Sequence, residues 1–396
     1  MARMPGEMPM KDRDELIAIR QDIHRHPETA FEEQRTSDIV AAKLREWGLD
    51  VHRGLARTGV VGTLKGRRPG QRAIGLRADM DALNLQELNE FAHRSAYDGK
   101  MHACGHDGHT TMLLGAARQL AADPDFAGTL YFIFQPAEEG QGGARVMMEE
   151  GLFDLFPCDA VYGMHNMPGL PAGQFAIRPG PLLAASDSWS MIFRGTGGHG
   201  AMPHRGTDPT MPAAAFITAT QTIAGRNVAA SDAAVVSVGH IQAGSAGSPN
   251  VIPAQVTVSG TARSYSPAVR DVIERRLGEL GRSLAAAHGC TAAYEYQRRY
   301  PPLINAPEQT ALAIRAAEQT VGRDRVDADT APLTGAEDFA FMLERKPGAY
   351  IFIGNGVDSE GGCHYVHTPH YDFNDEIIVT GVAWWVNLVR QELGAP

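Results

Sequence analysis

Cysteine is scarce in this chain, with only four among 396 residues: Cys104, Cys158, Cys290 and Cys363. So few cysteines in so long a chain exclude a disulfide framework of the kind that stabilises small secreted domains. We therefore expect free thiols, and a reducing compartment fits them.

Long apolar runs are also missing. No segment approaches the ~20 consecutive apolar residues that a membrane-spanning helix needs. The first 20 residues lack the apolar core of a secretory signal. We therefore expect no membrane partner and a cytoplasmic location.

Positive charge is in deficit, because 36 Lys and Arg stand against 46 Asp and Glu and leave a net charge of −10. The sequence has no basic stripe to displace counterions from phosphates, so the charge balance argues against a nucleic-acid partner. At 396 residues, two domains are the default expectation.

The stretch 101–109 (MHACGHDGH) concentrates imidazole and thiol groups, with His102, Cys104, His106 and His109 in nine residues. Borderline-soft metals such as zinc prefer these ligands, and the two glycines allow a tight bend. The alternative is a His-rich surface loop with a buried, inert cysteine. We favour a metal site because matching groups recur downstream.

Strands and helices alternate in the first and last parts of the chain, which predicts an α/β fold with a mostly parallel sheet. The apolar run Leu130–Phe134 is typical of a strand covered on both faces, and a helix is expected over Thr110–Ala122. Polar groups follow the carboxyl ends of successive strands, where open α/β sheets bind ligands. We expect the following side chains to converge there: Asp81, Cys104, His106, Glu139 and His165.

The middle of the chain has a different predicted order of elements, β-α-β-β-α-β, which is that of a split ferredoxin-like unit. We expect an inserted domain at 186–299, with 1–185 and 300–396 forming one discontinuous α/β domain. The pair Pro301-Pro302 marks the exit from the insertion.

A hydrolytic site with two metals needs roughly five ligand side chains, an open position for water and a base near that water. Four candidates are Cys104, His106, Glu139 and His165, and the segment 363–375 (CHYVHTPHYDFND) offers a fifth. The spacing alone does not choose among the three histidines of that segment.

Glu138 stands directly before Glu139, and adjacent residues on an irregular loop can point to different tasks. We expect Glu139 to bind metal and Glu138 to act as general base toward the water, in preference to a solvated acidic pair. Asp79 and Asp81 are expected to accept hydrogen bonds from ligand histidines; for one of the two, a helix N-cap is an equal alternative.

The inserted segment offers weaker candidates. The glycine-rich run around His199 (GTGGHG) lacks the Lys-Ser/Thr of a phosphate loop. His199 could stabilise an oxyanion, although a lone loop histidine more often has no such role. Asn250 and Arg263 are weaker still; Arg263 suits a carboxylate clamp, but strand-end arginines are more often solvated.

Together these motifs resemble those of the M20 metallopeptidase family, in its amidohydrolase branch of hippurate hydrolases, aminoacylases and indole-acetyl-amino-acid hydrolases. The matching stretches run in the family's order from Asp22 to Asp375. They are DIHRHPETAFEE, LRADMDAL, MHACGHDGH, FQPAEEGQGG, GMHN, GTGGHGAMPH, PNVIP, TGAEDFAF and HTPHYDFND. One departure is Asn84, where relatives usually carry proline.

The resemblance implies a di-metal hydrolase domain with an inserted ferredoxin-like dimerisation domain, cleaving the amide bond of N-acyl-amino acids. It implies two divalent ions per subunit, of zinc, manganese, cobalt or nickel. The implied ligands are Cys104, His106, Glu139, His165 and His367. Glu138 is the implied base, and the insertion is expected to form a homodimer or tetramer in which His199 reaches the partner's active site. Asn250 and Arg263 match positions that contact substrate.

Two alternatives remain open from the sequence. Cys104 could be a nucleophile activated by a nearby histidine, or the chain could bind a metal or a peptide without turnover. Neither alternative requires both the pair Glu138-Glu139 and the inserted domain.

Overall fold

The computed structural model describes residues 8–357 and 364–394. They form a larger unit of residues 8–180, 305–331, 341–357 and 364–394, and a smaller unit of Pro181–Ile304 and Pro332–Ala340. Cys104, Cys158 and Cys290 are buried free thiols, as expected, and Cys363 lies outside the described residues.

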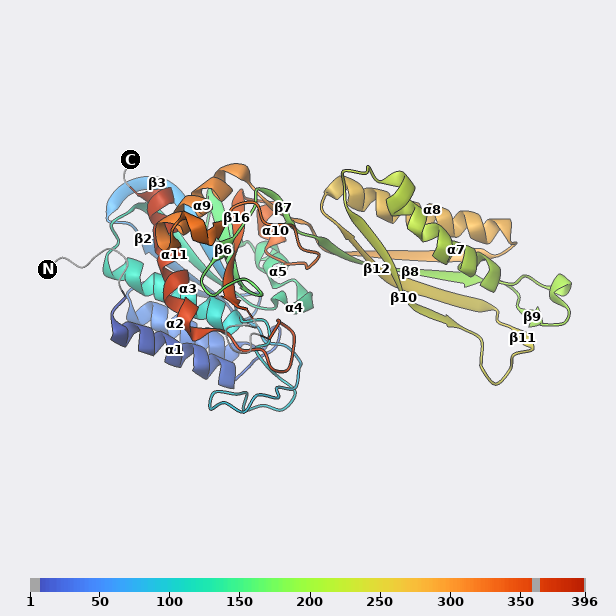
Figure 1. Cartoon of the computed structure of the whole chain (residues 1–396), viewed down its shortest axis with the longest axis horizontal. Helices are drawn as coiled ribbons and strands as arrows, with labels where there is room; N and C mark the ends of the chain where they lie inside the picture. The colour runs from blue at the N-terminus through green and yellow to red at the C-terminus, as the bar shows by residue number, and fades with distance from the viewer. Residues whose placement is uncertain (1–7, 358–363, 395–396) are drawn as a thin grey trace. The chain divides into compact units, whose positions relative to one another are not determined.

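The larger unit contains an eight-stranded sheet in the order β1-β2-β4-β3-β5-β16-β6-β15 (Figure 1). Its strands are β1 (Asp50–Leu55), β2 (Gly59–Lys65), β4 (Ala127–Gln135), β3 (Arg68–Asp79), β5 (Ala160–Pro168), β16 (Gly348–Gly356), β6 (Phe175–Ala176) and β15 (Val326–Asp327). The neighbours β4/β3, β3/β5, β5/β16 and β6/β15 are parallel. The predicted mostly parallel sheet is therefore confirmed at its centre, whereas β1, β2 and the β16/β6 pair are antiparallel.

The apolar core of the larger unit follows from these strands and from the helices beside them. Every residue of β16 is buried, and the expected two-sided strand lies in β4. Among the longer helices, α3 packs against α1, α2 and α11, and α11 also packs against α9 (Figure 1). The helices are α1 (Met10–Arg25), α2 (Gln34–Glu46), α3 (His106–Ala122), α4 (Glu138–Gln141), α5 (Gly143–Glu149), α6 (Leu152–Leu155), α9 (Pro307–Val321) and α11 (Ile378–Leu393). Shorter pieces are η3 (Arg323–Arg325), η5 (Asp375–Ile377) and α10 (Ala340–Leu343), the last at the boundary of the two units.

Helix α3 begins at His106, so the expected start at Thr110 is wrong. Gly105 precedes it with φ of 94°, a backbone conformation that suits glycine. A Cβ at this position would collide with the side chains of Asn166 and Tyr371. This close approach, which local sequence does not reveal, requires a glycine directly before the first helical turn, in which His106 lies.

The smaller unit contains the predicted β-α-β-β-α-β order. Its four-stranded sheet has the order β10-β12-β8-β13, with every neighbouring pair antiparallel. The elements are β8 (Ala185–Arg194), α7 (Thr210–Thr222), η2 (Ile223–Asn227), β10 (Ala234–Ala243), β12 (Gln255–Ser264), α8 (Pro267–Ala287) and β13 (Thr291–Tyr300). Short pieces are β7 (Gly180–Leu183), β9 (Gly198–His199), η1 (Pro203–Arg205), β11 (Val251–Ile252) and β14 (Leu303–Asn305). Residues 332–340, which the sequence analysis places in the α/β domain, belong to this compact unit.

Within the described residues, no helix combines the length and the apolar character that crossing a bilayer requires.

Candidate metal centre

Three neighbouring strands of the larger unit deliver polar side chains to one edge of the sheet. Strand β3 ends at Asp79, and β4 leads directly into Glu138 and Glu139 at the start of α4. Strand β5 carries His165 near its carboxyl end. Because these strands are adjacent and parallel, their carboxyl ends bring the side chains together, as the sequence predicts.

The five candidate ligands form two overlapping groups that share Cys104. One group is Cys104, His106 and His165, and the other is Cys104, Glu139 and His367; in each, the ligand atoms lie within 4.8 Å of one another. The Cys104 Sγ lies 3.4 Å from His165 Nε2, and Glu139 Oε1 lies 3.2 Å from His367 Nε2. The structure thus assembles all five around the same small volume.

The chemistry of this donor set fits metal ions. Among the described residues, both ring nitrogens of His106 and Oε1 of Glu139 are buried without a well-aligned hydrogen bond, although Asp81 and His367 lie 3.3 and 3.2 Å from His106 Nδ1 and Glu139 Oε1. A buried polar atom without a partner is costly, and a cation would satisfy Glu139 Oε1 and the one nitrogen of His106 that carries no proton. Burial also raises the pKa of the Cys104 thiol, so its thiolate requires a positive charge nearby.

The hydrogen bonds of the two ring nitrogens distinguish His165, a candidate ligand, from His109, a supporting residue. His165 Nδ1 donates to the carbonyl oxygen of Asn166 at 2.5 Å, which leaves Nε2 free to face Cys104. His109 Nδ1 donates to Asp79 Oδ1 at 2.6 Å, and its Nε2 accepts from the backbone N–H of Asn166 at 2.9 Å. Both nitrogens of His109 are therefore already used.

Asp79 and Asp81 lie beside the candidate ligands. Asp81 Oδ1 is 3.3 Å from His106 Nδ1, and Asp79 Oδ2 is 3.8 Å from His106 Nε2. Asp81 also accepts from the backbone N–H groups of Glu138 at 3.0 Å and Glu139 at 2.9 Å. Neither aspartate is itself an N-cap, but Asp81 satisfies the free amides at the start of α4 from a distance in sequence.

Asn166, which the sequence motifs do not single out, hydrogen-bonds to two segments of the site. Its side-chain N–H groups donate to the carbonyl oxygen of Cys104 at 2.6 Å, and its Oδ1 accepts from the Tyr371 hydroxyl at 2.8 Å. The signal was available in GMHN, where Asn166 directly follows a candidate ligand. His367 is held by its own backbone: its φ is 62°, and its N–H donates to the Ala103 carbonyl at 2.7 Å.

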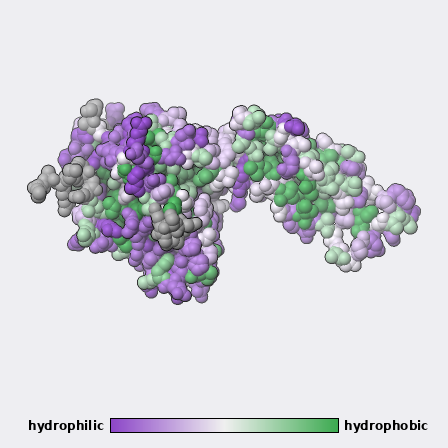
Figure 2. Space-filling model, viewed as in Figure 1, coloured by the Kyte–Doolittle hydropathy of each residue, from purple (hydrophilic) through white to green (hydrophobic). Residues whose placement is uncertain are grey.

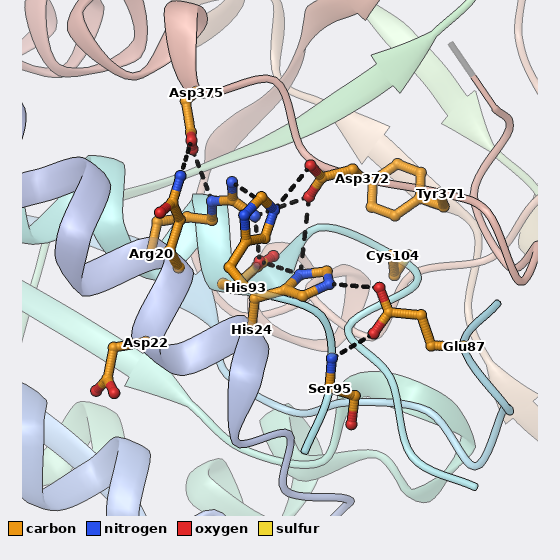
Figure 3. A network of polar contacts seen from close by, with 12 residues as sticks. Arg20, Asp22, His24, Glu87, His93, Ser95, Cys104, Tyr371, Asp372 and Asp375 are labelled. Atoms are coloured by element: carbon orange, nitrogen blue, oxygen red, sulfur yellow. Dashed lines mark hydrogen bonds and ion pairs between the residues drawn. The ribbon is translucent and has the colours of Figure 1, made fainter. Parts of the chain in front are cut away.

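Arg20 of α1 joins the two chain segments that carry His106 and His367. Its Nε donates to Asp375 at 2.7 Å, and its Nη1 donates to Asp372 at 2.8 Å and lies 3.6 Å from Asp107. Figure 3 shows the guanidinium of Arg20 pointing toward the first two carboxylates. Charge-assisted bonds of this kind fix geometry well when they are buried.

His24, one turn after Arg20, extends this buried network (Figure 3). Its Nδ1 lies 2.8 Å from Asp107 and its Nε2 lies 3.3 Å from Glu87. Burial disfavours its charged form, but the hydrogen bonds to these two carboxylates outweigh burial and raise the pKa of His24 to about 9. His24 belongs to the motif DIHRHPETAFEE, from which the sequence alone predicts no role for it.

The remaining predicted site residues lie in the smaller unit. His199 and Asn250 are exposed and close together, because the N–H of Gly200 donates to the carbonyl of Asn250 at 2.7 Å. Arg263 is half-buried on β12, and its Nη1 donates to the carbonyl of Ala262 at 2.9 Å. Their roles toward substrate remain predictions.

Comparison with known proteins gives consistent matches over nearly the whole chain. Residues 75–391 match the model of peptidase family M20/M25/M40. A hippurate hydrolase of Campylobacter jejuni is 39% identical over 379 residues, covering 96% of this chain and 97% of that protein. An N-acetyl-L-cysteine deacetylase of Bacillus subtilis is 38% identical over 366 residues, covering 92% and 85%. A solved B. subtilis structure, described as a dinuclear metal binding peptidase of the M20 family, has a TM-score of 0.84 at 31% identity, covering 96% and 98%.

The raised pKa of His24 predicts a pH-dependent contribution to stability. Since the folded-state pKa of about 9 exceeds the ordinary 6.5, this contribution is complete below pH 6.5 and is lost as the pH rises through 9. As the pH rises from 6.5 to 9, the contribution of His24 to the free energy of unfolding decreases by up to ~1.4 kcal/mol per pH unit.

Urea unfolding at several pH values tests this dependence. His24→Gln should remove this part of the slope, whereas His288→Gln, at an exposed position, should keep it. Identical slopes in the wild type and His24→Gln would show that His24 is not held as a buried cation.

Proposed function

Because this chain belongs to peptidase family M20/M25/M40, in its amidohydrolase branch, we propose that it is a metal-dependent amidohydrolase of N-acyl-amino acids. The products are a carboxylic acid and a free amino acid. The observation that carries the proposal is the meeting of five ligand-type side chains beside a buried glutamate, Glu138, that is not among them. One ring nitrogen of His106 and one carboxylate oxygen each of Glu138 and Glu139 lie within 4.8 Å of one another, which supports the proposed action of Glu138 on a water at this site.

The residues that would hold two divalent ions are Cys104, His106, Glu139, His165 and His367, and Cys104 belongs to both of the groups described above. When bound, such ions polarise the amide carbonyl and acidify the attacking water. Glu138 takes a proton from that water and delivers it to the departing amine. Asp81 holds the backbone of Glu138 and Glu139, so that both carboxylates keep their places.

The smaller unit supplies the proposed substrate contacts. His199 donates a hydrogen bond to the developing oxyanion, a contribution of typically ~100-fold or more in rate. Asn250 and Arg263 bind the substrate, and the guanidinium of Arg263 suits the amino-acid carboxylate.

A screen of benzoyl-, acetyl-, long-acyl- and indole-acetyl-amino acids, each with Zn²⁺, Mn²⁺, Co²⁺ and Ni²⁺, tests the reaction class. We expect hydrolysis of at least one N-acyl-amino acid, its loss after chelation, and its return when metal is added back. Activity that survives chelation would favour the Cys104 nucleophile instead. Bound metal without hydrolysis of any substrate would favour a binding protein.

Glu138→Gln should lower kcat by ~100-fold or more, because the amide cannot take the proton from water. Metal content, measured by elemental analysis, should stay that of the wild type. The control is Glu149→Gln, at an exposed position of α5 nearby in the chain. Parental turnover in Glu138→Gln would show that another group is the base.

The proposed homodimer forms through the smaller unit. Strand β10 is an edge strand of its sheet, and an edge strand can pair with the same strand of a second copy. Val235 and Ile241 on this strand and Met211 on α7 are exposed. Figure 2 shows apolar residues gathered on this part of the molecule, as expected for an interaction surface.

Mixing two inactive variants tests the dimer and the role of His199 together. In a mixed dimer of Glu138→Gln and His199→Ala subunits, one active site combines an intact Glu138 with the partner's intact histidine. After subunit exchange, random pairing should restore about one quarter of wild-type activity. Each variant alone should stay inactive, and failure of the exchanged mixture to gain activity would contradict a contribution of His199 across the interface.

A further inference from the structure

Glu33, at the start of α2, is a fully buried carboxylate outside the ligand set. Its Oε1 accepts from the backbone N–H of Ala137 at 2.9 Å and from that of Phe31 at 3.0 Å. Its Oε2 accepts from the Thr58 hydroxyl at 2.6 Å. The carboxylate therefore links a segment near the N-terminus to the residue that immediately precedes Glu138.

The two amides bound by Oε1 belong to residues with an unfavourable backbone conformation. Phe31 has φ of 63° and Ala137 has φ of 57°, in the left-handed region that residues with a Cβ seldom adopt. Such a conformation persists only where its surroundings hold it in place. At Ala137, the bond to Glu33 is part of what holds it.

The turn after β4 is thus bound by two carboxylates in succession. Glu33 accepts from the amide of Ala137, and Asp81 accepts from the next two amides, those of Glu138 and Glu139. Three consecutive N–H groups that no α-helical carbonyl could satisfy are therefore all paired. The direction of the Glu138 and Glu139 side chains depends on this backbone.

We propose that Glu33 is a positioning residue for the active site, acting through the Ala137 amide to hold the turn that carries Glu138 and Glu139. The inference rests on the proposed function for the roles of these two glutamates. Oε1 can accept both amides whether or not Oε2 carries a proton, so the action of Glu33 requires an acceptor and not a charge. Burial raises the pKa of Glu33 to about 7, in keeping with a group that does not depend on its charge.

Two substitutions with side chains of similar length distinguish the effect of the hydrogen-bond acceptor from the effect of side-chain volume. Glu33→Gln keeps an oxygen for both amides, whereas Glu33→Met fills the space but leaves them unpaired. We expect Glu33→Met to weaken metal binding, measured by competition with a chromogenic chelator, by roughly 10-fold or more. We expect kcat to fall by a similar factor with little change in KM, and Glu33→Gln to stay within about 3-fold of the wild type in both.

Matched controls are Glu32→Met and Thr58→Val. Glu32 is adjacent but exposed, with its side chain on Thr29 and Lys100, and Thr58→Val removes only the hydroxyl bond to Glu33. Both should keep wild-type metal affinity. Because metal affinity is measured without substrate, it reports on Glu33 even if no N-acyl-amino acid is hydrolysed.

Hydrogen exchange at the Ala137 amide provides a test that needs no variant. In the metal-free wild type, this amide should exchange as slowly as those of β4, because Glu33 holds it. Rapid exchange at the Ala137 amide would overturn the proposal. This test remains valid even if Glu33→Met fails to fold, because it uses the wild type. Wild-type metal affinity in a folded Glu33→Met, or equal damage in Glu33→Gln and Glu33→Met, would overturn it as well.

Discussion

Several electron-rich side chains are buried together at one edge of the sheet. The free-energy cost of burying them is the constraint on which the rest of the structure depends. Cys104 and Glu139 approach the ring of His106, while Asp79 and Asp81 lie behind that ring. Carboxylates and thiolates are costly to bury unless a positive charge compensates them. Among the described residues, the ring nitrogens of His106 and Oε1 of Glu139 form no well-aligned hydrogen bond. Divalent ions would provide the missing charge and the missing ligand bonds together.

Holding these groups in place without the ions requires a rigid frame, and the surrounding chain provides it mostly through backbone contacts. Asn166 binds the carbonyl of Cys104, and Ala103 accepts from the N–H of His367. Asp81 binds two amides of the turn after β4. Arg20 contacts both Asp107 at the start of α3 and Asp372, and so connects these two segments. A frame of this kind keeps the ligands close to their bound geometry, which lowers the cost of binding metal and substrate.

Much of this site was predictable, because parallel strands bring their carboxyl ends to one edge whatever the loops do. That rule places Glu139 and His165 together from strand patterns alone. His367 follows no strand end; its left-handed backbone and its bond to Ala103 are tertiary features, and only the family resemblance selected it. The approach of Tyr371 to Gly105, directly before the start of α3 at His106, is likewise a tertiary feature. The roles of Arg20 on α1 and Glu33 at the start of α2 could not be predicted. In the sequence both look like ordinary surface residues, because their partners are distant along the chain.

Crystals grown with Zn²⁺ or Mn²⁺ and measured at the absorption edge of the metal test the central claim most directly. The account predicts two anomalous peaks in the larger unit, with Cys104 bound to both ions and His106, His165, Glu139 and His367 completing the ligand set. A map in which Cys104 and His367 lie outside bonding distance of any ion would contradict it.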